Sequence, residues 1–249
     1  MLARTACAAA LIGAALVSVF GLLHGWWHVN RPKAARFSVR GVDVSRHQGD
    51  IRWAVVAREG GTAFAYLKAT EGGDWTDPRF SENWREAKRA GLLVGSYHFF
   101  TFCRPALDQA EHFLATVPHD PEALPPAVDV EYAGNCHEVP PPEIVRHELM
   151  AWLDAVEDAI GKVPVIYVTA EAHKDFLQGA PLKNPLWIRS LLGEPKVQWL
   201  FWQYEARGTV KGIDGLVDLN VFIGDPAALG ELASGRAGHS FGTPAIRER

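Results

Sequence analysis

The chain has 249 residues, of which 48% are hydrophobic and 22% are charged. This composition excludes a disordered or collagen-like protein and suits one large domain or two small ones. The first 36 residues carry four cations, Arg4, Arg31, Lys33 and Arg36, and no acid, so the formal net charge of −4 for the whole chain leaves −8 on residues 37–249. So acidic a domain is not expected to bind nucleic acid.

An apolar stretch lies near the N-terminus. Residues 5–23 form a run of 19 residues without a charge, which is long enough to span a bilayer as a helix, while its Ala-rich start also suits a secretory signal peptide. No clean small-x-small cleavage site lies before Trp26 and Trp27, so we favour an uncleaved membrane anchor. A buried core helix is the third alternative, disfavoured because the segment has no polar face. Residues 1–36 are therefore assigned as a signal or membrane anchor followed by a basic linker.

Residues 37–225 alternate apolar runs of strand length with segments of helical period, which predicts a single α/β domain. Helices are expected at residues 77–91, with Asp77 as N-cap and Pro78 in the first helical position, and at residues 105–117 and 143–161. Residues 226–249 have no periodic pattern and are expected to form a flexible C-terminal tail. Strands are expected at residues 37–45, 63–70, 92–100, 126–132, 163–169, 185–190 and 197–205.

Polar residues collect at the ends of these predicted strands. In a barrel of parallel strands the carboxyl ends of the strands line one open face, where catalytic groups gather. The pattern therefore predicts a single site at that face. Its members from the first, second, third, fourth, fifth and last predicted strands are Asp43, Ser45, Lys68, Thr70, Tyr97, His98, Asp129, Glu131, Tyr167, Trp202, Gln203 and Tyr204.

The most informative pair is Asp129 and Glu131. Residues i and i+2 of a strand project from the same face, so both carboxyl groups should point into one cavity. Their mutual repulsion raises the pKa of at least one of them and provides a proton donor beside an ionised partner, as glycoside cleavage requires. Asp43 and Asp218 would add a third and a fourth carboxyl group. The alternatives are solvated loop acids and a metal site, although no characteristic ligand spacing accompanies the acids.

Other candidates have simpler alternatives. His98 is either a buried core histidine or part of the wall of the site, and its place at a strand end favours the wall. Trp75, Trp187, Trp202, Tyr167 and Tyr204 are aromatic side chains that can stack on sugar rings but that also occur as core residues. We include those near strand ends in the predicted site.

Seven stretches of the sequence, in their order and spacing, resemble the glycoside hydrolase family 25 lysozymes, which are N-acetylmuramidases. The resemblance runs from about Arg40 to Phe222. The stretches are GVDVSRHQGDIRW, FAYLKATEGGDWTDPRFSENWREAKRAGLLVGSYHFF, PPAVDVEY, PVIYVT, LWI, WQY and GIDGLVDLNVF.

The resemblance implies a TIM-like β/α barrel with a reduced set of outer helices, and hydrolysis of the β-1,4 bond from N-acetylmuramic acid to N-acetylglucosamine in peptidoglycan. Glu131 would be the general acid and base, with Asp129, Asp43 and Asp218 completing the acidic site. Either the N-acetyl group of the substrate or a carboxylate of the protein would be the nucleophile. The substrate-binding residues would be Asp218, His98, Tyr97, Lys68, Tyr167, Trp187, Arg189, Trp202, Gln203 and Tyr204, and no cofactor or metal is expected.

The chain departs from the family after LWI. Members commonly have a small residue and then Tyr there, whereas this chain has Arg189, Ser190 and Leu191. The departure removes an expected sugar contact and puts a cation in the site, where it can meet a carboxylate of the peptide part of the substrate.

Cys103 and Cys136 follow the third and fourth predicted strands. Consecutive strands of such a barrel are usually neighbours, so we expect a disulfide between the two loops, with two unpaired buried thiols as the alternative. A disulfide requires an oxidising compartment, and we expect a monomer that is membrane-anchored or secreted, with its catalytic domain outside the cytoplasm. A catalytically inactive peptidoglycan-binding module and a metal-dependent deacetylase or nuclease are the competing functions.

Overall fold

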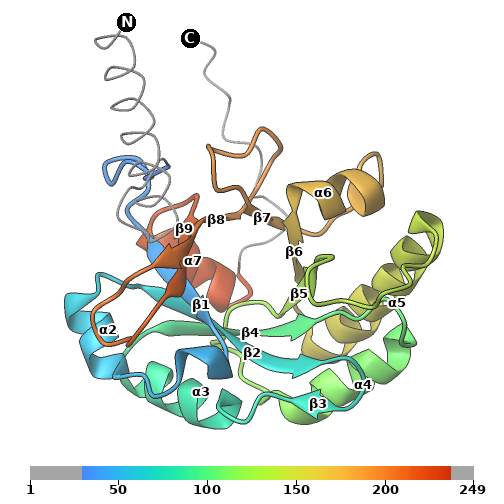
Figure 1. Cartoon of the computed structure of the whole chain (residues 1–249). Coiled ribbons are helices and arrows are strands. Elements are labelled where there is room, and N and C mark those ends of the chain that lie inside the picture. Colours follow the sequence, from blue (N-terminus) through green and yellow to red (C-terminus); the bar gives the residue numbers. More distant parts are fainter. Residues whose placement is uncertain (1–29, 237–249) are drawn as a thin grey trace, which may run out of the picture.

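The computed structural model describes residues 30–236. The predicted signal or membrane anchor at residues 5–23 lies outside this range, and the described part of the chain contains no helix long and apolar enough to cross a membrane. Its strands form one sheet in the order β1-β9-β8-β7-β6-β5-β4-β2-β3, and β1 also pairs with β2. This last pairing closes the sheet into a barrel, and β3 lies outside the ring (Figure 1).

The seven predicted strands are all present within a few residues of their expected bounds. Neighbours from β1 through β2, β4, β5, β6 and β7 to β8 are parallel. The strands are β1 (Arg40–Val44), β2 (Phe64–Glu71), β3 (Trp75–Thr76), β4 (Leu93–Phe99), β5 (Ala127–Val130), β6 (Val165–Thr169), β7 (Leu186–Arg189), β8 (Phe201–Gly208) and β9 (Val217–Phe222).

β9 corrects the expectation of an all-parallel barrel. It runs antiparallel to both β8 and β1, and residues 197–205 are not the last strand. The link from Gly208 to Val217 is too short for the crossover that a parallel connection needs. Because of this reversal, Asp218 at the start of β9 lies at the same end of the barrel as the carboxyl ends of the parallel strands.

Helices cover only part of the barrel (Figure 1). The three predicted helices are α3, α4 and α5, but α3 begins three residues after Asp77. The Asp77 carboxylate instead accepts the N–H groups of Arg46 and Arg79 and stabilises the turn before the helix. The helices are α2 (Trp53–Glu59), α3 (Phe80–Arg89), α4 (Ala106–Thr116), α5 (Pro142–Ile160), α6 (Ala170–Ala172) and α7 (Pro226–Ala233), with short helical turns at Arg46–Gln48 and His173–Leu177.

α7 corrects the prediction that the ordered domain ends at residue 225. Asp225 caps this helix by accepting the N–H of Ala228. Leu229 and Leu232 are buried with the residues that fill the interior of the barrel. A helix of two turns presents too few apolar residues for its period to be read in the sequence. The helix closes the end of the barrel opposite Asp43 and Asp129.

Aromatic side chains fill the barrel below the acidic residues. Phe64, Tyr66, Trp187 and Phe201 are buried there, and the rings of Tyr66 and Trp187 lie 4.8 Å apart. A second apolar cluster lies between the strands and the helices. The interior is thus a packed core, as expected of such barrels, and it forms the floor of the polar site above it.

Candidate active site

Four carboxyl groups meet at one end of the barrel. Asp43 of β1 is paired in register with Asp218 of β9. Asp129 lies in β5, one residue before its end at Val130, and Glu131 follows directly after the strand. The charges of Asp43 and Asp218 both act on Asp129. The sequence prediction that these four residues share one site agrees with this geometry.

Asp43 is the most firmly held of the four. Its Oδ2 accepts hydrogen bonds from Asn220 Nδ2 at 2.7 Å and from Gln203 Nε2 at 3.0 Å. Each of these amides is oriented in turn, because Trp187 Nε1 donates to Asn220 Oδ1 and the Tyr167 hydroxyl donates to Gln203 Oε1. The network keeps one carboxylate in a fixed place within the barrel.

Asp218 is hydrogen-bonded to Asp43. Burial, followed by the charge of Asp43, raises the pKa of Asp218 to about 9. Burial also raises the pKa of Asp43, but the hydrogen bonds from Asn220 and Gln203 oppose this effect. The proton of this pair therefore resides on Asp218, which donates it to Asp43.

Asp129 and Glu131 form a second pair with different surroundings. Asp129 is buried, and its Oδ1 has no hydrogen-bond partner among the described residues. Burial and then the charge of Glu131 raise the pKa of Asp129 well above its usual value. The Glu131 side chain is 16% exposed, and its Oε2 lies 3.4 Å from Arg189 Nη1. Burial raises the pKa of Glu131 and Arg189 opposes the rise, so the more accessible carboxyl group is suited to donate a proton.

A cationic and aromatic rim borders the acids. Lys68 Nζ lies 2.7 Å from Glu71 Oε2 and also sits over the rings of Trp75 and Phe99. The charge of Lys68 lowers the pKa of Asp129. Tyr97 faces the same cavity, since the charges of Asp43 and Asp129 contribute to raising its pKa after burial.

Three predicted substrate contacts lie on the wrong side of the barrel wall. Successive side chains of a strand point to opposite faces, so Tyr97 and Gln203 point inward whereas His98, Trp202 and Tyr204 point outward. Trp202 packs on Phe37 and donates to the Ser190 carbonyl, and Tyr204 accepts from Arg40. These two aromatics belong to the packing between the barrel and residues 30–37.

His98 is a core histidine and not part of the site. Its fully buried ring stacks on Trp152 of α5 at 5.5 Å. Gln109 donates from Nε2 to two carbonyls, so its Oε1 accepts from His98 Nε2 and the Thr70 hydroxyl donates to His98 Nδ1. Burial lowers the pKa of His98 to about 3, which keeps it neutral. Trp187 is likewise fully buried and supports the floor of the site.

Sequence reasoning missed Asn220, which is completely buried and holds Asp43. The available signal is its position two residues after Asp218, because this spacing places both side chains on the inward face of one strand. Within residues 30–236, no three or more His, Cys, Asp or Glu side chains are arranged to hold a metal ion.

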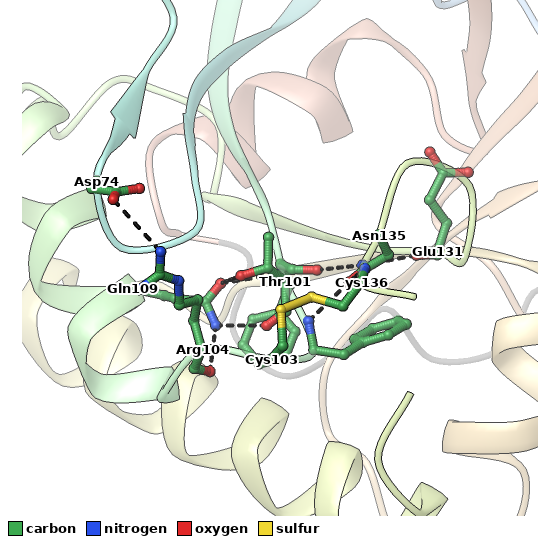
Figure 2. Close-up of a disulfide and its surroundings, with 10 residues drawn as sticks. Asp74, Thr101, Cys103, Arg104, Gln109, Glu131, Asn135 and Cys136 are labelled. Atoms are coloured by element: carbon green, nitrogen blue, oxygen red, sulfur yellow. Dashed lines mark hydrogen bonds and ion pairs between the residues drawn. A yellow bond between two sulfur atoms is a disulfide. The ribbon is translucent and has the colours of Figure 1, made fainter. Parts of the chain in front are cut away.

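The predicted disulfide joins Cys103 and Cys136, with 6.1 Å between the α-carbons. It links the loop after β4 to the loop after β5, and Glu131 lies at the beginning of the second loop (Figure 2). The expectation from strand order is confirmed, because β4 and β5 are neighbours in the sheet.

The open end of this closed barrel presents a partly exposed carboxyl group of raised pKa beside a second, buried acid. This is the arrangement of an acid–base glycoside hydrolase. The chain matches the family described as "Glycosyl hydrolases family 25" over residues 42–213, and it belongs to that family.

Three relatives illustrate the match. Lysozyme M1 of Streptomyces globisporus is 33% identical over 80% of this chain and 72% of its own. A protein of Escherichia coli K12 described as "Uncharacterized protein YegX" is 37% identical over 81% of this chain and 75% of its own. The solved structure of a family 25 glycosyl hydrolase from Bacillus anthracis superposes with a TM-score of 0.76 at 37% identity, covering 81% of this chain and 96% of that one.

Proposed function

We propose that this glycoside hydrolase is a muramidase that cleaves the β-1,4 bond from N-acetylmuramic acid to N-acetylglucosamine in peptidoglycan. The observation that carries the proposal is the Asp129–Glu131 pair. A partly exposed carboxyl group of raised pKa stands next to a buried one, and one oxygen of the buried group has no hydrogen-bond partner among residues 30–236. Family membership and the relative named as a lysozyme support the same activity.

In the proposed first step, Glu131 donates its proton to the glycosidic oxygen as the C1–O bond breaks. The carbonyl oxygen of the N-acetyl group on the same sugar attacks C1 and forms a cyclic oxazolinium. The N-acetyl N–H donates to Asp129 Oδ1, the buried acceptor that has no partner among the described residues. While Glu131 holds its proton it does not repel Asp129, and Lys68 lowers the pKa of Asp129. In this scheme Asp129 is therefore the ionised member of the pair and stabilises the positive charge. The product with a free 4-hydroxyl then leaves.

In the second step, Glu131 acts as a base. Its carboxylate removes a proton from water as the water oxygen attacks C1 and the ring of the oxazolinium opens. The configuration at C1 is retained and Glu131 regains its proton. Asp43 and Asp218 take no proton from the substrate in this scheme, and their hydrogen-bonded pair shapes the opposite wall of the cavity.

The sugar and its peptide would contact the remaining inward and rim residues. Tyr97, Tyr167 and Lys68 line the cavity beside Asp129, and Gln203 supports Tyr167 from behind. The Arg189 side chain is 33% exposed and makes one contact of 3.4 Å with Glu131. Its remaining N–H groups can bind a carboxylate of the peptide attached to the muramic acid.

The proposed location of the domain is outside the cytoplasm. The Cys103–Cys136 disulfide supports an oxidising compartment, and peptidoglycan lies in such a compartment. We propose that residues 5–23 hold the enzyme at the membrane as a monomer, with a cleaved signal peptide as the alternative that N-terminal sequencing of the exported protein distinguishes.

The test compares the full-length enzyme with Glu131→Gln on purified peptidoglycan. The products are reduced with borohydride and identified by mass spectrometry. The wild-type enzyme should create new reducing ends on muramic acid, and Glu131→Gln should lose at least about a hundredfold in turnover, because general acid catalysis contributes 10²–10⁴-fold.

The matched control is Glu138→Gln, which removes an exposed carboxylate from the same loop and should keep full activity. Reducing ends on glucosamine, or Glu131→Gln turnover within tenfold of wild type, would overturn the proposal. A binding module would retain peptidoglycan without creating any reducing end, and a metal-dependent enzyme would be inactivated by a chelator.

A further inference from the structure

We infer that Asn135 is a positioning residue for catalysis, because its side chain fixes the backbone from which Glu131 reaches the substrate. The inference rests on the proposed role of Glu131 as the acid and base. Asn135 lies four residues after Glu131, in the loop that the disulfide joins to the end of β4 (Figure 2).

The Asn135 amide joins the ends of two strands. Its Nδ2 donates to the Glu131 carbonyl at 3.0 Å and to the Phe100 carbonyl at 2.8 Å. Its Oδ1 accepts from the Phe102 N–H and the Cys136 N–H, both at 2.9 Å. Two donors and two acceptor lone pairs are all that a carboxamide possesses, so each is used. The amide thus connects the Glu131 peptide to the neighbouring strand.

Glu131 needs such support because β5 ends at Val130, just before it. Within the part of the chain that the structure describes, its carboxyl group has one polar contact, with Arg189. At 3.4 Å this contact is too long to orient the carboxyl group firmly. The position of the proton donor therefore depends on the backbone, and the hydrogen bond from Asn135 is the contact that holds the Glu131 carbonyl.

The residue type matters at this position. An aspartate would place a carboxylate oxygen against the carbonyls of Glu131 and Phe100 and would provide no donor. Alanine would leave these carbonyls and two N–H groups without their partner. These four hydrogen bonds are partly buried, so losing them should shift the backbone of the loop that carries Glu131.

The disulfide has a different role. It ties Cys136 to Cys103, whereas the Asn135 amide reaches the Glu131 peptide directly. Gln109 of α4 holds the loop after β4, because its side chain forms hydrogen bonds with both the N–H and the carbonyl of Thr101. Loss of the disulfide should therefore reduce stability while the position of Glu131 is kept, and loss of the Asn135 amide should change catalysis.

The experiment measures kcat, KM and Tm of the full-length Asn135→Ala and Asn135→Asp variants on soluble peptidoglycan fragments. We expect kcat to fall about 10- to 100-fold, the range in which a misplaced catalytic group reduces rate, with KM within about threefold of wild type. Asn135→Ser, which keeps one donor and one acceptor, should give an intermediate kcat and guards against failure of the other variants to fold.

Two controls separate positioning from general stability. Asn184→Ala removes a buried amide far from the site, whose Nδ2 donates to the Pro164 carbonyl at the opposite end of β6. The second control is the Cys103→Ser/Cys136→Ser variant. Each control should lower Tm but leave kcat within about threefold of wild type. The inference is overturned if Asn135→Ala does the same. If Glu131→Gln is fully active, the proposed function has failed, whatever the result at Asn135.

Discussion

Removing the Cys103–Cys136 disulfide should destabilise the domain by an amount set by the length of chain that it closes. The two cysteines are 33 residues apart. The loop-entropy relation then gives about 4 kcal/mol at 25 °C for the Cys103→Ser/Cys136→Ser variant. A domain of this size changes its Tm by about 2–4 °C for each kcal/mol, so Tm should fall by about 8–15 °C.

The assay is thermal unfolding followed by circular dichroism, with both proteins in a Cys7→Ser background so that no other thiol is present. Cys7→Ser alone should leave Tm unchanged. Thiol titration of the denatured, unreduced protein should find no free thiol before reduction and two afterwards. Two free thiols in protein exported to an oxidising compartment, or a decrease in Tm below about 3 °C, would refute the reasoning.

Two further predictions concern titration in the site. The pKa of the Asp218 carboxyl group is about 9 in the folded state, against an ordinary pKa of 3.8. Between these two pH values the folded state binds more protons than the unfolded state, so this group makes the stability fall as pH rises. Asp218→Asn should therefore raise Tm increasingly from pH 4.5 to 8.5, and a pH-independent difference would contradict the assignment. Arg189 lowers the pKa of Glu131, so Arg189→Gln should raise that pKa and move the alkaline limb of the kcat profile to higher pH. The control Arg207→Gln changes an exposed position and should leave the profile unchanged. Identical profiles for the two variants would contradict the assignment.

Much of the proposed chemistry of the site can be predicted from local features of the sequence. The i, i+2 spacing of Asp129 and Glu131 at the end of an apolar strand is a local property, and strand geometry converts it directly into two carboxyl groups on one face. The pairing of Cys103 with Cys136 could also be predicted, because the two cysteines follow consecutive strands and consecutive strands are usually neighbours. The helices at α3, α4 and α5 were also evident, since each is long enough to show its period.

Which of two adjacent side chains faces the cavity could not be predicted from the sequence. The strands of this barrel pack against its filled interior on one side and helices or loops on the other, and strands buried on both faces lack the polar–apolar alternation that marks the inward side. Tyr97 and His98 are therefore indistinguishable in sequence, although one faces the acids and the other stacks on Trp152. Asn135 bonds the carbonyl of Phe100, which lies 35 residues before it in the chain. No local pattern encodes this contact, because it exists only after β4 and β5 have paired.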